Sequence, residues 1–142
     1  MRSAYLEQNS GVTAGVKKKV ENITVARTLT NDDSGKVFML DAAGGAYSIT
    51  LPTSLEDGVY YKFIVEEETP SNAITIAAGS AIVSLVMKDA GGNASNSTVG
   101  TQVSNIVIGT SAQKGDYINV MAAGEEWVCE CLSGIDNAVT TS

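Results

Sequence analysis

Gly58-Val59-Tyr60-Tyr61-Lys62-Phe63-Ile64-Val65 contains the strongest β-strand pattern in the chain. Successive side chains of a strand point to opposite faces, so Tyr61, Phe63 and Val65 would share one face. β-branched and aromatic residues favour strands, and a glycine favours a turn before one. The stretch therefore predicts a strand over residues 59–65.

Similar short patterns occur on both sides of this strand and are separated by turn signals. Further strands are expected at residues 23–28, 36–40, 48–51, 73–76, 82–87, 104–108, 117–121 and 126–132. The last two flank residues 122–125 and predict a hairpin. Only residues 54–57 suggest a helical turn. Eight or nine short strands at regular spacing predict an all-β fold, a single β-sandwich or barrel-like domain.

The length of 142 residues fits one domain with short additions at its ends. We expect an extended N-terminal arm over residues 1–20, an all-β domain over residues 21–134 and a flexible C-terminal tail over residues 135–142. The sequence shows no signal peptide and no run of about 18 apolar residues, so we expect no membrane partner.

Charge is unevenly distributed along the chain. Residues 1–20 carry four basic side chains and one acidic side chain, a formal +3, whereas the remainder carries five basic and fifteen acidic side chains, a formal −10. An acidic body argues against nucleic acid as a partner. The basic segment is either a solvated tail or an arm that becomes ordered against an acidic neighbouring subunit.

Residue content argues against enzyme chemistry. The chain has no histidine, which removes the commonest general base and metal ligand. Cys129 and Cys131 lack the further ligands of a zinc site and are expected in or near a core. The carboxylate clusters at residues 66–68 and 125–126 are expected to be solvated. We therefore expect a non-enzyme with no catalytic residue, no metal, no cofactor and no small-molecule substrate.

Three segments resemble a recurring module of phage structural proteins. They are residues 28–45 with Ile49-Thr50-Leu51-Pro52, residues 58–65, and Gly115-Asp116-Tyr117-Ile118-Asn119-Val120 with Trp127-Val128. Together they cover roughly residues 24–132. The pattern is similar to that of head decoration (cement) proteins and related fibre domains of tailed phages.

This resemblance implies a non-enzymatic homotrimer that binds the major capsid protein at threefold positions and stabilises the outer capsid surface of a virion assembled in the host cytoplasm. The hypothesis places capsid contacts in the arm, at Tyr5, Leu6, Lys17, Lys18 and Lys19. It places the trimer interface at the large aromatic residues Tyr60, Tyr61, Tyr117 and Trp127.

Other functions remain open at this stage. The alternative is a trimeric tail-fibre or baseplate module that binds a host receptor through the loops at residues 66–72 and 89–97. A carbohydrate hydrolase that uses Glu125 or Glu126, or an unrelated β binding module, would also fit a chain of this size.

Overall fold

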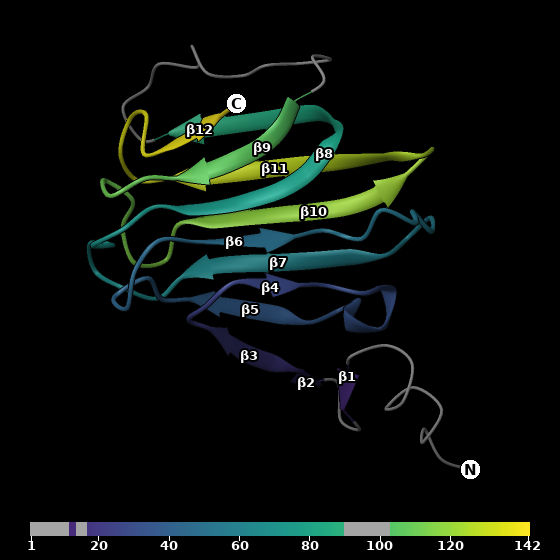
Figure 1. Ribbon diagram of the computed structural model, residues 1–142, viewed down its shortest axis with the longest axis horizontal. Coiled ribbons are helices and arrows are strands. Elements are labelled where there is room, and N and C mark those ends of the chain that lie inside the picture. Colours follow the sequence, from purple (N-terminus) through teal and green to yellow (C-terminus); the bar gives the residue numbers. More distant parts are fainter. Residues whose placement is uncertain (1–11, 14–16, 90–102) are drawn as a thin grey trace.

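The computed structural model describes residues 12–13, 17–89 and 103–142, and the regular secondary structure of these residues is almost entirely β-strand (Figure 1). Two mixed sheets of five strands each pack face to face. The expected all-β sandwich is therefore confirmed. No helix among the described residues is long and apolar enough to cross a membrane.

The two sheets share one long strand. The first sheet has the order β4 (Arg27–Thr28), β6 (Tyr47–Thr50), β8 (Ile74–Asp89), β9 (Val103–Ile108) and β12 (Val139–Thr141). The second has the order β3 (Val20–Ile23), β5 (Val37–Leu40), β7 (Tyr60–Val65), β10 (Tyr117–Ala123) and β11 (Glu126–Ser133). The short strands β1 (Val12–Thr13) and β2 (Lys17–Lys18) pair with each other, and a 3₁₀ turn, η1, spans Asn31–Asp33.

The N-terminal half winds between the two sheets. Strands β3, β5 and β7 pair in parallel in the second sheet, while β4, β6 and the start of β8 pair in parallel in the first. From β3 to β8, each strand therefore lies in the opposite sheet from the strand before it. Strands that pair within one sheet are two apart in chain order, one turn of the winding from each other. The C-terminal half differs, because β10 and β11 form an antiparallel hairpin within one sheet.

Strand β8 joins the sheets because it changes partners along its length. Residues 74–77 pair with β6 on one side and with β9 on the other, whereas residues 82–89 pair with β11. The register with β9 shifts between Ala77 and Ile82, and Gly79 in this stretch has φ +58°. Glycine adopts this backbone without the steric cost of a side chain, so it suits the point where the strand leaves β6 and its register with β9 shifts.

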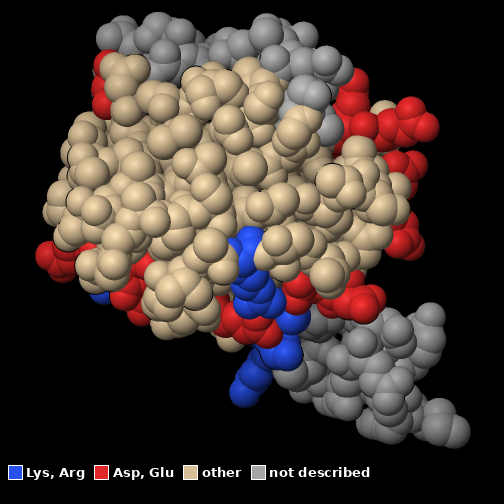
Figure 2. All heavy atoms as spheres, viewed as in Figure 1, with Lys and Arg blue, Asp and Glu red and all other residues tan. Residues whose placement is uncertain are grey.

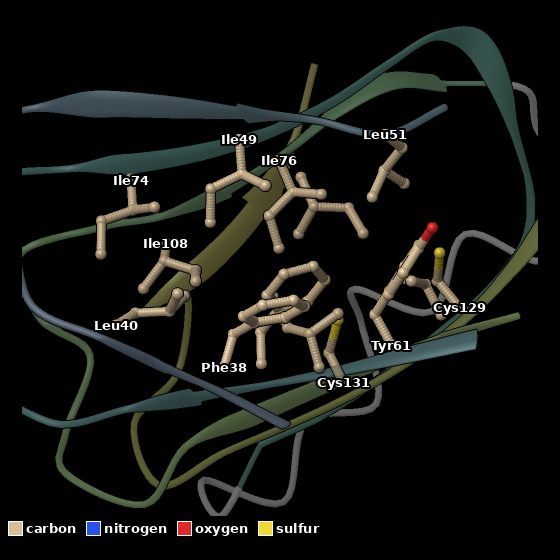
Figure 3. Packing of buried hydrophobic residues seen from close by; sticks show 14 of the residues in the cluster. Phe38, Leu40, Ile49, Leu51, Tyr61, Ile74, Ile76, Ile108, Cys129 and Cys131 are labelled. Carbon is tan, nitrogen blue, oxygen red and sulfur yellow. The ribbon is translucent and has the colours of Figure 1, made fainter. Parts of the chain in front are cut away.

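The core lies between the sheets (Figure 3). The second sheet contributes an aromatic group in which the ring centroids of Phe38 and Phe63 are 5.7 Å apart and those of Tyr61 and Trp127 are 5.8 Å apart. Apart from Tyr47 of β6, the facing side chains of the first sheet are aliphatic. They include Ile49, Ile74, Ile76, Ile106 and Ile108. Rings packed against branched chains fill the space between two sheets.

Several predicted boundaries are wrong. The segment at residues 23–28 forms no single strand, because β3 and β4 lie in different sheets. The segments at residues 73–76 and 82–87 form one strand, β8. Residues 54–57 form no helix, and the single helical turn described is η1. The predicted tail, residues 135–142, contains β12, where Val139 is buried and pairs with Ile108.

The predicted hairpin is confirmed. Strands β10 and β11 pair from Tyr117 and Leu132 up to Ala123 and Glu126, which leaves Gly124 and Glu125 as the turn. Both turn residues have positive φ, +64° and +67°. Two positive φ angles are the requirement of the type I′ turn, which normally has glycine, asparagine or aspartate at these positions.

We predict that Glu125→Gly stabilises the protein by about 1 kcal/mol, because it removes a side chain from a left-handed backbone position. The melting temperature should rise by about 2–4 °C, as measured by calorimetry. The same change at the neighbouring strand residue, Glu126→Gly, serves as the control and should lower it. A lower melting temperature for Glu125→Gly would contradict the assignment of the turn.

Candidate interaction surface

One exposed area of the second sheet combines apolar and charged side chains. It consists of the outward positions of three adjacent strands and is called here the nine-residue face. Its members are Tyr60, Lys62 and Ile64 of β7, Tyr117, Asn119 and Met121 of β10, and Val128, Glu130 and Leu132 of β11. Their inward neighbours on the same strands are buried in the core, so the period of the strands fixes these nine side chains outward.

The register arranges the nine residues in three rows that run across the strands. One outer row is Tyr60, Met121 and Val128, and the other is Ile64, Tyr117 and Leu132. The middle row is Lys62, Asn119 and Glu130. Two apolar rows therefore enclose one polar row, and the polar row has a cation at one end and an anion at the other.

The apolar part of the face is unusually open to solvent. Met121 is 46% exposed, Leu132 43% and Val128 37%. Isolated exposed hydrophobic residues are common, but a contiguous apolar area on a rigid sheet is typical of an interaction site. Part of the face is hollowed by a groove of about 520 Å³. Its outward lining residues are Lys18, Tyr60, Lys62, Asn119, Met121, Val128 and Glu130.

Cations lie against the aromatic rings of the face. The Lys62 ammonium is 4.6 Å from the Tyr117 ring centroid, and the Lys18 ammonium is 5.6 Å from that of Tyr60. Such contacts hold a long side chain along the surface instead of extended into water. At the other end of the middle row, the Asn119 amide donates to Glu130 over 3.5 Å.

The four aromatic residues predicted for a trimer interface separate into two pairs. Tyr60 and Tyr117 lie half-buried on the nine-residue face. Tyr61 and Trp127 are 0% and 1% exposed in the core of the chain itself, so neither presents a surface to another copy. The prediction for these two residues is wrong because adjacent strand positions point in opposite directions. Burial raises the pKa of Tyr61, whose hydroxyl donates to the Thr30 carbonyl over 2.7 Å.

The residues predicted to bind a capsid lie at the N-terminal end. Lys17 and Lys18 form β2 and are exposed, as is Lys19. Lys19 forms an ion pair of 3.4 Å with Glu21 of its own chain. On the face that Figure 2 shows, basic side chains gather at the β2–β3 edge while acidic side chains lie around much of the rim. The remaining predicted contacts, Tyr5 and Leu6, lie outside the described residues.

Seven residues of the nine-residue face are absent from the sequence-based prediction. They are Lys62, Ile64, Asn119, Met121, Val128, Glu130 and Leu132. The available signal is the alternation itself: once Tyr61 and Phe63 are assigned to the core, Lys62 and Ile64 must face outward. The prediction relies instead on large aromatic residues, and size does not distinguish the two faces of a strand.

The side chains considered for catalysis or metal binding include two buried cysteines and a glutamate that binds backbone amides. Cys129 and Cys131 are buried and free, and burial raises the pKa of the Cys129 thiol to about 12, so it is no nucleophile near neutral pH. Glu67, expected to be solvated, accepts hydrogen bonds from the backbone amides of Ala42 and Ser71. Among the described residues, no group of three acidic or cysteine side chains is placed to hold a metal ion.

A network of four charged side chains links the two sheets near the β3 edge. The Arg27 guanidinium contacts Glu21 at 2.8 Å and Asp33 at 3.1 Å, and the Lys36 ammonium contacts the same two carboxylates at 3.0 Å and 2.6 Å. Asp33 also accepts from the Thr30 amide over 3.1 Å and so closes the turn before β5. Asp33 therefore has two cationic partners, and Glu21 has three, because Lys19 also pairs with it.

The network alters the acidity of its members. Burial raises the pKa of Glu21, but hydrogen bonds from Arg27 and Lys36 outweigh burial and hold that pKa at about 2. Burial likewise opposes ionisation of Asp33, and Lys36 with the Thr30 amide lowers its pKa overall. A carboxyl whose pKa is lower in the folded than in the unfolded chain stabilises the fold above its unfolded pKa.

We predict that Lys36→Met lowers the free energy of unfolding by about 2–4 kcal/mol at pH 7, because it leaves Asp33 with Arg27 as its one cationic partner and removes the best buried of the cations that pair with Glu21. In the wild type, stability should fall as the pH is lowered from the ordinary Glu21 pKa of 4.5 to about 2. This fall should be smaller in Lys36→Met. Urea unfolding across this pH range measures both effects, with Lys114→Met at an exposed loop position as the control. An unchanged pH dependence would show that the network does not stabilise the fold.

Comparison with known proteins gives no further assignment. No protein-family model matches the chain, and no curated protein matches it.

Proposed function

We propose that this protein is a non-enzymatic structural protein of a phage virion, a decoration protein that binds the outside of the capsid and stabilises it. The major capsid protein is the proposed partner. Threefold positions and a homotrimeric state are the parts of this proposal that come from the sequence resemblance alone. The phage virion and the capsid partner also come from that resemblance, and the surface supports binding to another protein.

The observation that carries the proposal is the nine-residue face. It exposes large apolar side chains on three paired strands, so little conformational entropy is lost when a partner covers it. Apolar area removed from water contributes roughly 25 cal/mol per Å², which favours a protein partner of matching shape. A polar row within the apolar area supplies orientation as well as affinity.

The distribution of charge adds a second contact of a different kind. Lys17, Lys18 and Lys19 lie exposed at the end of an otherwise acidic chain. Basic side chains at this position would contact an acidic part of the capsid surface, and the strength of that contact would fall as salt is added. Several weak contacts made by many bound copies combine into tight overall binding.

Cryo-electron microscopy of virions that contain this chain tests the proposal. We expect density that fits the sandwich on the outer surface of the head at threefold positions. Density confined to the tail would reject the decoration function and favour the tail-fibre or baseplate alternative.

A binding assay tests the charged contact separately. Lys17→Glu with Lys18→Glu should reduce binding to heads that lack the protein at least about tenfold at low salt, because attraction becomes repulsion. Lys114→Glu, which lies in an exposed loop, is the control for charge. Equal binding by the double variant and the control would show that the basic segment does not contact the capsid.

A further inference from the structure

The nine-residue face has a symmetry that follows from its register. Strand β10 lies in the middle and pairs antiparallel with β7 on one side and with β11 on the other. A half-turn about an axis along β10, in the plane of the face, exchanges the positions of β7 and β11. It places Lys62 over Glu130, Tyr60 over Val128 and Ile64 over Leu132 of a second copy.

We propose that the nine-residue face binds the same face of a second copy of this chain about a two-fold axis along β10. Two sheets would then pack with their strands aligned, which is a usual arrangement for sheets that pack face to face. A two-fold interface uses one surface patch on both copies, so the patch must be complementary to itself.

Charge complementarity selects this axis. Within the described part of the chain, neither Lys62 nor Glu130 forms an ion pair, and β10 separates their strands by about 10 Å. The proposed axis brings Lys62 of each copy to Glu130 of the other, twice in the interface. An axis across the strands would instead bring Lys62 to Lys62, and like charges in contact are unfavourable.

The apolar residues agree with the same axis. Tyr60 meets Val128 of the other copy in one outer row, and Ile64 meets Leu132 in the other. Met121, Asn119 and Tyr117 of β10 lie along the axis and meet their own counterparts. Each apolar row therefore covers an apolar row. The half-exposed side chain of Met121, at the centre of one row, is removed from water when the two copies meet.

This inference concerns the same face that supports the proposed function, and the two occupants exclude each other there: a face covered by a second copy leaves the exposed lysines at residues 17–19 as the capsid contact. Only the register and exposure of three strands are used to infer the second copy. The two-fold contact also constrains the number of copies. A two-fold contact in a protein with threefold symmetry joins two trimers, so the expected assemblies contain two or six chains. A trimer without this contact contains three.

A charge exchange tests the pairing. Sedimentation velocity of the full chain over a range of concentrations should show two or six chains for the wild type. Lys62→Glu and Glu130→Lys should each raise the dissociation constant of the two-fold contact at least about tenfold, because they place like charges in contact. The variant with both changes should recover the wild-type mass, because opposite charges then meet again at both pairs, with their signs exchanged.

The controls separate association from folding. Glu68→Lys changes the net charge as Glu130→Lys does, but it lies in the exposed loop between β7 and β8, and it should leave the mass unchanged. Melting temperatures of all variants check that the sandwich is intact. A wild type that stays monomeric at all concentrations, a trimer, or an assembly that the exchange does not restore would overturn the inference.

A cross-link tests the axis without changing any charge. Asn119→Cys places a thiol on the axis opposite its counterpart, so mild oxidation should give a covalent dimer on a non-reducing gel. The native Cys129 and Cys131 are buried and do not compete. Ser48→Cys, on the exposed side of β6 in the other sheet, is the control and should stay monomeric. Equal cross-linking at both positions would reject the assigned face.

Discussion

The stacking of Phe38 on Phe63 fixes the register on which the rest of the second sheet depends. Their ring centroids lie 5.7 Å apart, and the two residues are direct partners in the parallel ladder of β5 and β7. The two strands come from different turns of the winding, so no short loop sets their alignment. Because a shift of one residue would turn every side chain to the opposite face, burial of both rings determines which residues face outward.

The same constraint explains how far the sequence predicts the structure. Alternation in β7 and the turn residues before β11 identify these strands correctly, because both signals are local. The winding between the sheets, the single long β8 and the pairing of β12 with β9 depend on contacts between distant segments. For the candidate site, residue type alone selects the large aromatic residues Tyr61 and Trp127 for an interface, and both are buried. The strand register instead places their neighbours Lys62 and Val128 on the surface. Large side chains favour burial wherever a core position is open to them.

The charged network shows a further limit of local patterns. Glu21, Arg27, Asp33 and Lys36 lie within 16 residues, and of their ion pairs only Asp33–Lys36, three residues apart, has the spacing of a helical pairing rule. They meet because the chain crosses from β3 to β4 and returns to β5, which brings an arginine from one sheet to carboxylates near the other. Charges placed in this way stabilise one particular winding more than they stabilise any isolated strand.

Rigidity and exposure are linked in this fold. The inward side chains of β7, β10 and β11 pack in the core, so the outward side chains of the same strands are held at fixed spacing. A surface held in this way discriminates between partners by where its charges fall as well as by its apolar area. Lys62 and Glu130 stand at equal distances on either side of β10, one of each sign. A surface with that arrangement matches its own image after a half-turn, and a partner of uniform charge would leave one end of the row opposed by a like charge.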